Sequence, residues 1–257
     1  LFLFLCNRMY RITVILSFLI SMSSLAQSEI KTNQGFLFTP QYAYHTPGAD
    51  LKDRFNAFSA LGLGVDYKFK NNFSIGVNYE WLFGNNVKNT SPFSSITSTS
   101  GQVIDQNGDF SIIRLNMKGN LATFNLGYLI NLPTDEPNSG LLIQVGSGFM
   151  QHRIDILSSQ VTIPQVNEEY EYGYDKLTYG LVTSQYIGYQ YLVEKNRYHF
   201  RLGVAFNQGF TQGRRTWDFN TNTSGLDKRL DMSVALKASI IVPVYTKSAK
   251  TEKFFID

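Results

Sequence analysis

The stretch 73–81 (FSIGVNYEW) constrains the fold more than any other part of the sequence. Its apolar residues recur at every second position: Phe73, Ile75, Val77, Tyr79 and Trp81. Because successive side chains of a β-strand point to opposite faces, this alternation predicts a strand with one apolar face. The aromatic residues lie at the two ends of that face with Ile75 and Val77 between them, which is typical of a strand whose apolar side crosses lipid.

The composition agrees with a strand-rich protein. The 257 residues include 20 Phe, 15 Tyr and 20 Gly, and only 17% are charged. Helical cytosolic domains carry more charge, nearer a quarter of the chain, whereas Tyr, Phe and Gly favour strands and tight turns. The net charge of +3 is too small to indicate a nucleic-acid partner.

The first 26 residues read as a leader. Arg11 supplies a positive charge, residues 12–20 form an apolar run, and Ser24-Leu25-Ala26 is a small-residue cleavage site. Residues 1–26 are thus expected to comprise an upstream extension (1–8) and, with translation starting at Met9, a signal peptide that is cleaved after Ala26. The alternative is an uncleaved anchor helix, although the apolar run is shorter than the roughly 20 residues that span a bilayer.

The only cysteine, Cys6, precedes the apolar run. The mature chain therefore cannot form a disulfide, a thiolate metal site or a cysteine nucleophile. No other apolar stretch reaches 18 residues, so a membrane-spanning form of this chain must be a closed barrel.

The alternation seen in residues 73–81 recurs along the chain. We predict eight strands, at about residues 35–45, 61–69, 73–81, 111–130, 140–156, 177–193, 198–207 and 230–244. Long and short connections alternate between them, which is the pattern of outer-membrane barrels. The predicted fold is therefore all-β: an eight-stranded antiparallel up-and-down transmembrane β-barrel over residues 35–245, with a lead-in at 27–34, a tail at 246–257 and both termini periplasmic.

The fourth predicted strand carries an irregularity. Ile113, Leu115 and Met117 are apolar at odd positions, whereas Ala122 and Phe124 continue the apolar face at even positions. We therefore predict a β-bulge at residues 119–120, which would keep both apolar sets on the outer face.

Aromatic residues near the predicted strand ends are candidates for the two interfacial girdles. These residues are Tyr42, Tyr44, Tyr67, Phe69, Phe73, Tyr79, Trp81, Tyr128, Tyr198 and Phe200.

The strand pattern resembles a known group of proteins. A leader ending in Leu-Ala-Gln, the hairpin formed by LGVDYKF (63–69) and FSIGVNY (73–79), and the eight-strand layout are similar to the small outer-membrane barrels of Bacteroidota. These barrels are loosely similar to OmpA-type and opacity-type barrels. Several of them are accessory subunits of outer-membrane machines, such as type 9 secretion or barrel assembly, so the resemblance implies a role of that kind.

Charged residues are predicted at inward-facing positions. They are Asp66, Lys68, Glu80, Arg114, Lys118, Arg201, Asp231 and Lys237. The interior of an eight-stranded barrel is just wide enough for side chains to fill, and buried charges must pair. The mixture of both signs favours a plug of salt bridges; the alternative is a narrow proton or ion path.

Two loops gather charge and tyrosine. The third long loop carries Glu168, Glu169, Tyr170, Glu171, Tyr172, Tyr174 and Asp175, and Arg214, Arg215, Lys228 and Arg229 flank the fourth. Neighbouring loops of opposite charge predict exposed ion pairs between them. The alternative is a binding site for a partner protein or for lipopolysaccharide, with arginines holding phosphate.

No residue pattern indicates a catalytic, cofactor or metal site. Asp105, Asn107 and Asp109 resemble the start of a calcium loop, but the glycine and the final glutamate are misplaced, so an Asn-Gly turn is favoured. His45 and His152 fall near one rim, and Ser59 or Ser147 could approach them, which leaves a lipid A-modifying enzyme as an alternative.

The sequence therefore predicts a non-enzymatic barrel that needs no cofactor. Its partners would be outer-membrane lipid, lipopolysaccharide and other outer-membrane proteins, with a complex subunit as the favoured role. A lipid A-modifying enzyme, a narrow channel and a surface adhesin or anchor are the alternatives.

Overall fold

The computed structural model describes residues 34–85, 87–88, 103–104, 110–111, 113–132, 136–158, 172–193, 198–219 and 222–245. The predicted signal peptide, the 105–109 turn, residues 168–171 and the 246–257 tail lie outside these ranges. Within the described residues no helix is long and apolar enough to cross a membrane.

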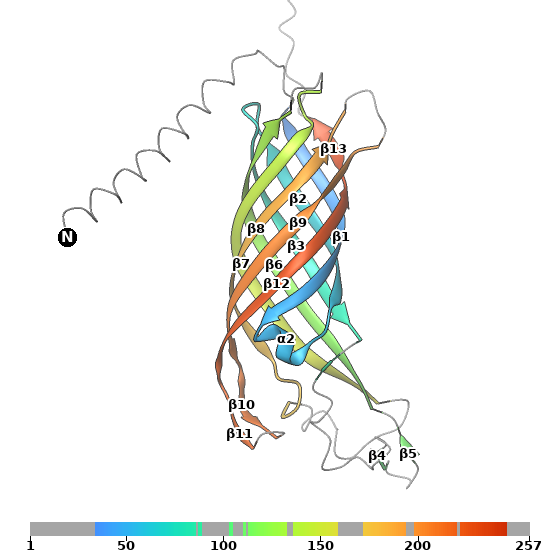
Figure 1. Cartoon of the computed structure of the whole chain (residues 1–257), viewed down its shortest axis with the longest axis vertical. Coiled ribbons are helices and arrows are strands. Elements are labelled where there is room, and N and C mark those ends of the chain that lie inside the picture. The colour runs from blue at the N-terminus through green and yellow to red at the C-terminus, as the bar shows by residue number, and fades with distance from the viewer. Residues whose placement is uncertain are drawn as a thin grey trace, which may run out of the picture. The chain divides into compact units, whose positions relative to one another are not determined.

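Eight antiparallel strands form a closed ring, which confirms the predicted fold (Figure 1). The ring is closed because β1 pairs with β2 on one side and with β12 and β13 on the other. We count β12 and β13 as one strand interrupted at Ile241. In ring order the strands are β1 (Gly35–Ala49), β2 (Phe58–Lys68), β3 (Phe73–Gly84), β6 (Ile113–Asn131), β7 (Gly140–Ser158), β8 (Thr178–Tyr191), β9 (Phe200–Gly213), β12 (Lys228–Ile240) and β13 (Val242–Tyr245).

The two ends of the ring differ. At one end, here called the turn end, Gly35 pairs with Tyr245 and the short 69–72 turn joins β2 to β3. Asn72 adopts φ 66° in this turn, a left-handed conformation that asparagine tolerates well. The opposite end, the loop end, carries the smaller elements: α2 (Leu51–Arg54), β4 (Val103–Ile104), β5 (Phe110–Ser111), β10 (Arg215–Asp218) and β11 (Thr223–Gly225).

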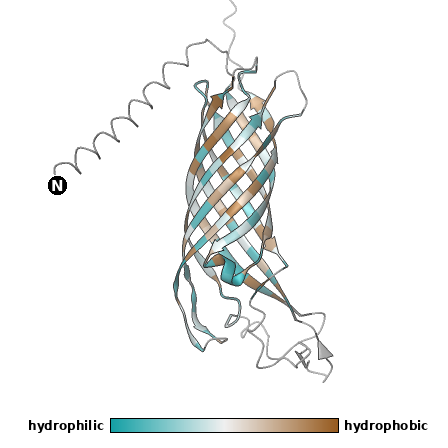
Figure 2. Ribbon diagram, in the orientation of Figure 1, coloured by the Kyte–Doolittle hydropathy of each residue, from teal (hydrophilic) through white to brown (hydrophobic). Residues whose placement is uncertain are grey.

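Side chains alternate between the two surfaces of the ring. In β3, Ser74 and Glu80 are buried inside, whereas Val77 and Trp81 are exposed on the outer wall. Figure 2 shows the same alternation of polar and apolar residues along the other strands. An apolar outer wall is stable only in contact with lipid, so the strands are membrane-spanning.

The register of β6 corrects one part of the sequence analysis. β6 pairs with β3 and β7 without interruption through residues 119–120, so the predicted bulge is absent there. One alternation therefore runs along the whole strand, and Met117 is buried inside the ring. Arg114 and Lys118 consequently lie on the outer surface and are exposed, not in the interior where we expected them.

Apolar clusters close the interior towards both ends. Near the loop end, Leu51 and Phe55 of the α2 segment pack with Leu82, Met150 and Ile154, all of which are almost completely buried. A smaller cluster of Leu37, Leu192 and Ile241 lies at the turn end. The polar and charged interior residues lie between or beside these clusters.

A lipid-facing charge should destabilise the barrel. Val77 lies in the middle of the outer wall of β3 and is 54% exposed. We expect Val77→Arg to reduce the free energy of unfolding by about 2–4 kcal/mol, the cost of a cation near the bilayer midplane. Urea unfolding in phospholipid vesicles would measure this change.

Thr46→Arg provides the control, because Thr46 is exposed at the loop end of β1, where the expected cost is about 0–1 kcal/mol. Equal destabilisation by the two substitutions would contradict the assignment of the outer wall to lipid.

Candidate functional site

The middle of the interior is organised by Glu80. The Lys237 ammonium donates to Glu80 Oε1, and Gln41 Nε2 donates to the same oxygen over 3.1 Å. His45 Nε2 lies 3.3 Å from Glu80 Oε2, although the two atoms lack the alignment of a hydrogen bond. Gln41 and His45 lie on β1, Glu80 on β3 and Lys237 on β12, so these contacts connect three strands across the interior.

A hydrogen-bond chain extends from His45 towards the opposite wall. Ser233 Oγ lies 3.3 Å from His45 Nδ1 and accepts from Asn207 Nδ2 over 3.2 Å. Ser184 Oγ donates to Asn207 Oδ1 over 2.7 Å. Ser233, His45 and Glu80 thus lie in the order of a serine–histidine–carboxylate array. All three are at most 2% exposed, so a substrate could not reach the serine without disrupting the interior.

A second ion pair lies nearer the turn end. Arg201 Nη1 donates to Asp66 Oδ2 and Arg201 Nη2 to Gln190 Oε1, both over 2.9 Å. Lys68 Nζ donates to Asn138 Oδ1 over 3.1 Å.

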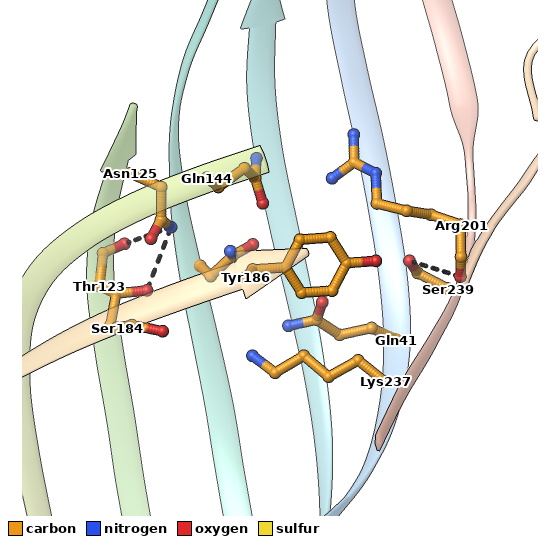
Figure 3. A pocket seen from close by; sticks show the side chains of 10 residues that line it. Gln41, Thr123, Asn125, Gln144, Ser184, Tyr186, Arg201, Lys237 and Ser239 are labelled. Carbon is orange, nitrogen blue, oxygen red and sulfur yellow. Dashed lines mark hydrogen bonds between the residues drawn. The ribbon is translucent and has the colours of Figure 1, made fainter. Parts of the chain in front are cut away.

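Between Arg201 and Lys237 lies a cavity of about 20 Å³, into which Tyr186 also points (Figure 3). This volume holds about one water molecule, so the interior is a packed core.

Two glycines make room for Tyr186. A Cβ atom at Gly188 would lie 2.3 Å from the Tyr186 hydroxyl, and one at Gly203 would lie 2.6 Å from it. The tyrosine therefore crosses the interior over bare backbone, and glycine is required at both positions because any side chain would collide with the tyrosine hydroxyl and with neighbouring backbone atoms.

A third polar layer lies beneath the loop end. His152 Nε2 is 2.9 Å from Asp231 Oδ2, and Thr211 Oγ1 donates to that oxygen over 2.5 Å. Arg229 Nη2 lies 3.4 Å from Asp231 Oδ1 and donates to the Asp50 carbonyl over 2.5 Å. His152 and Asp231 are fully buried, and Phe55 covers the imidazole edge-on at 5.4 Å. This layer is therefore sealed by the α2 segment.

Arg54 of α2 fastens that segment to the third long loop. Its Nη1 donates to Thr178 Oγ1 over 2.7 Å and to the Lys176 carbonyl over 3.2 Å. Burial, followed by the nearby charge of Arg229, lowers the pKa of Arg54 to about 10. The guanidinium remains charged at neutral pH and fixes α2 over the loop end.

The described parts of the third and fourth loops contact each other. Asp175 is fully buried and accepts two hydrogen bonds from Arg215, one of them from Nε over 2.9 Å. Lys176 Nζ lies 3.3 Å from Asp218. The tyrosines contribute through Tyr172, whose ring lies 4.4 Å from the Arg215 guanidinium. Of the other predicted loop residues, Glu168, Glu169, Tyr170 and Glu171 lie outside the described residues.

The loop contact leaves an aromatic face exposed on the β10–β11 hairpin. Trp217 and Phe219 follow Arg215 at every second residue, and both are more than 40% exposed. Phe219 contacts Tyr174 at 5.4 Å and its amide donates to the Gly173 carbonyl over 3.1 Å. We call Tyr172, Trp217 and Phe219 the hairpin face.

The candidate catalytic residues are not brought together by the fold. Ser59 lies on the outer wall, where its hydroxyl is 2.8 Å from that of Tyr42, whereas His45 points inward. Ser147 is likewise exposed outside and His152 buried inside. The interior serine that does contact His45 is Ser233, which sequence reasoning missed because strand alternation does not reveal contacts across the interior.

The aromatic candidates form belts towards both ends of the outer wall. At the turn end, Phe73 contacts Tyr128 at 4.8 Å, and Tyr67 contacts Phe69 at 5.0 Å. Tyr198 and Phe200 are also exposed at this end. Tyr42, Tyr44, Tyr79 and Trp81 are exposed nearer the loop end, where the Tyr79 hydroxyl donates to Asn120 Oδ1 over 2.8 Å.

A polar patch interrupts the apolar wall between these belts. Ser147, Thr183 and Gln208 are register neighbours on β7, β8 and β9, and Gln185 follows Thr183 on the same side of β8. Gln208 Nε2 donates weakly to Gln185 Oε1 over 3.4 Å. We call these four residues the wall patch. Sequence reasoning missed them because β8 has the weakest alternation.

Arg114 and Lys118, which we expected in the interior, lie on the outer surface near the loop end. Lys118 Nζ is 2.7 Å from Asp155 Oδ2, and Arg153 is 3.7 Å from the same carboxylate. Among the described residues, no group of three or more His, Cys, Asp or Glu residues is arranged to hold a metal ion.

A closed ring of eight antiparallel strands, with an apolar outer wall and a filled polar interior, defines an outer-membrane β-barrel protein. No protein-family model and no curated protein matches the chain.

Several solved structures are similar to this chain, among them three bacterial surface or outer-membrane proteins. The attachment invasion locus protein Ail of Yersinia pestis, solved with the heparin analogue sucrose octasulfate, has a TM-score of 0.43 and 12% identity, covering 82% of this chain and 100% of that one. Neisserial surface protein A has a TM-score of 0.42 and 14% identity, covering 83% and 100%. OprG of Pseudomonas aeruginosa has a TM-score of 0.34 and 11% identity, covering 85% and 98%.

The pairing of Glu80 with Lys237 should be essential for stability. Removing one partner leaves a buried charge uncompensated, so we expect Lys237→Met to reduce the free energy of unfolding by about 3–5 kcal/mol. The double variant Glu80→Gln, Lys237→Met should be more stable than Lys237→Met alone, since no carboxylate is then left without its ammonium partner. Urea unfolding in vesicles would compare the two; a double variant at least as unstable as the single one would refute the pairing argument.

Proposed function

We propose that this protein is a non-enzymatic, non-conducting outer-membrane barrel that serves as an accessory subunit of a larger envelope complex, such as a secretion or protein-assembly machine. The wall patch is the observation that carries the proposal. It would contact a second membrane protein inside the bilayer. We further propose that the loop end faces outward and that both termini are periplasmic.

The chemistry of the wall patch supports a protein neighbour. Hydrocarbon cannot hydrogen-bond, so an amide or hydroxyl facing it without a partner costs about 1–3 kcal/mol. The weak contact between Gln185 and Gln208 leaves one amide nitrogen and one amide oxygen without a partner in the described chain. Polar side chains inside a membrane commonly mark functional surfaces, because another protein can pair them and lipid cannot.

The position of the wall patch strengthens this argument. Outside the patch, the outer wall between the aromatic belts is apolar on the described strands, for example at Leu63, Val77 and Leu236. The polar Ser59 and Asn120 lie at the level of the loop-end belt, and each hydrogen-bonds a tyrosine hydroxyl. The patch is therefore a localised departure from the lipid-facing pattern.

The packing of the interior supports a non-conducting barrel. A selective pore usually lines itself with charge of one sign around an open path. Here the buried cations Arg201 and Lys237 are each paired with a carboxylate, and the cavity between them holds about one water molecule. Transport through this core would require breaking buried ion pairs.

The placement of the histidines supports a non-enzymatic role. His45 and His152 are at most 1% exposed, and the candidate serines Ser59 and Ser147 lie on the other side of the wall from them. A lipid A-modifying enzyme needs its nucleophile and base together at a surface that the lipid can reach.

A surface adhesin is a second candidate, and the hairpin face favours it. Trp217 on β10 and Phe219 directly after it are exposed beyond the loop-end limits of β9 and β12, so lipid does not account for their exposure. Exposed aromatic residues of this kind are common in protein contacts.

The wall patch can be tested by replacing its polar groups with apolar ones of similar size: Ser147→Ala, Thr183→Val, Gln185→Leu and Gln208→Leu. We expect the variant to fold, because its wall becomes more compatible with lipid, but to lose its partner. The measurement is co-migration of the native protein with a stoichiometric partner after extraction in mild detergent. Thr46→Val on β1 is the control and should keep the partner. A wild-type protein that migrates as a single barrel would refute the complex.

A conductance measurement distinguishes a non-conducting barrel from a narrow channel. We expect purified wild-type protein in planar bilayers to show no single-channel events under voltages of either sign, because buried ion pairs fill the interior. Discrete openings that disappear in Arg201→Gln would overturn the non-conducting assignment.

A further inference from the structure

A groove on the outer wall lies next to the loop-end limit of the apolar band. It has a volume of about 440 Å³ and runs over β7, β8, β9 and β12. Phe149, Leu181 and Phe210, which are register neighbours on three adjacent strands, line it with large exposed apolar side chains. Gly180 also lines the groove, next to Leu181 on β8.

Two cations border the groove on the side of the loop end. Lys228 and Arg214 are both exposed, and neither forms an ion pair with a described carboxylate. The Arg214 guanidinium lies over the Tyr179 ring at 4.1 Å. Stacking of this kind holds the guanidinium plane in place and leaves its in-plane N–H groups free to bind an anion.

A third cation of the groove, Arg229, already has partners within the protein. Arg229 also lines it, but its Nη2 donates to the Asp50 carbonyl over 2.5 Å and lies 3.4 Å from Asp231. The unpaired positive charge of the groove therefore comes from Arg214 and Lys228.

The height of the groove in the membrane can be estimated from β8. With a rise of about 3.3 Å per residue and a tilt of about 40°, the strand climbs roughly 20 Å from Tyr189 to Leu181. The apolar band of such barrels is about 25 Å tall, so Leu181 lies near its upper limit. Arg214 and Lys228 then lie at headgroup height, with the apolar row at the height of the first acyl carbons.

We propose that this groove is a binding site for a lipid with an anionic phosphate headgroup, in the leaflet at the loop end. The phosphate would bind between Arg214 and Lys228, with the arginine donating two parallel hydrogen bonds. An acyl chain would lie along Phe149, Leu181 and Phe210. The charge of the site selects an anionic headgroup, and the apolar row requires that the phosphate be attached to a chain.

The site is independent of the proposed complex. It uses the row of outward residues next to the wall patch, but none of the patch residues themselves. Purified protein alone in a bilayer is sufficient to test it, so loss of the partner and loss of lipid binding are separate results.

The test uses phosphatidylcholine nanodiscs containing the purified protein and a small fraction of labelled phosphatidic acid or of diacylglycerol with the same chains. These two lipids differ only in the phosphate. We expect the wild-type protein to enrich phosphatidic acid over diacylglycerol, and Arg214→Gln, Lys228→Gln to reduce its apparent affinity for phosphatidic acid by at least about tenfold.

Lys118→Gln, Arg153→Gln is the matched control. It removes one lysine and one arginine from the same end of the barrel outside the groove, and should change the affinity less than about twofold. Equal losses in both double variants would mean that the rim attracts anionic lipid through general charge, which overturns the site. Equal enrichment of diacylglycerol would also overturn it, since the phosphate would then be irrelevant.

Two further experiments test the role of the acyl chain: competition with inorganic phosphate, and labelling with a lipid that carries a photoactivatable chain. We expect millimolar inorganic phosphate not to displace phosphatidic acid, because it lacks a chain to lie in the groove. Displacement would contradict the role of the apolar row. Phosphatidic acid with a photoactivatable chain should label Phe149, Leu181 and Phe210, and uniform labelling around the barrel would refute the groove.

Discussion

The constraint on which the structure depends is the pairing of backbone groups where no water is available. In hydrocarbon an unpaired N–H or C=O costs several kcal/mol, so a strand there needs a neighbour on each side. β1 satisfies this requirement by pairing with β2 and, at the other edge, with β12 and β13. A closed ring in turn fixes which side chains face lipid and which meet inside. The interior network, the aromatic belts and the wall patch all follow from that division.

Inside the ring, charge is tolerated because it is paired in layers. Asp66 with Arg201, Glu80 with Lys237, and Asp231 with His152 and Arg229 lie at successive heights, and apolar clusters close the interior near both ends. The pairs of Asp66 with Arg201, Glu80 with Lys237 and Asp231 with His152 join strands that are distant in sequence. The interior therefore holds the wall in one register.

Alternation alone was enough to predict the eight strands and the direction of most side chains, because a lipid-facing wall imposes a strict period of two. It was wrong at Arg114 and Lys118, where apolar residues on both faces of β6 suggested a bulge although Met117 belongs to the core. It also could not reveal partners across the interior: nothing local indicates that His45 meets Ser233 or that Arg201 meets Asp66. The wall patch and the groove lined by Phe149, Leu181 and Phe210 could be recognised only from the register between strands. Sequence spacing does not give this register, because it is set by how neighbouring strands pair.

The closing seam between β1 and β12 also has a kinetic consequence. Tyr42 pairs with Ala238, and Leu230 donates its amide to Asp50 Oδ2 over 2.7 Å, so the seam joins nearly the first and the last described segments. Loop closure over such a separation is slow, and folding rates fall as contacts become less local. The ring cannot close until the C-terminal strand has been delivered to the membrane. Until then, the edges of β1 and of the last inserted strand are unpaired and open to chaperones or to an insertion catalyst. Pairing of β12 with β1 is therefore the step that completes the fold.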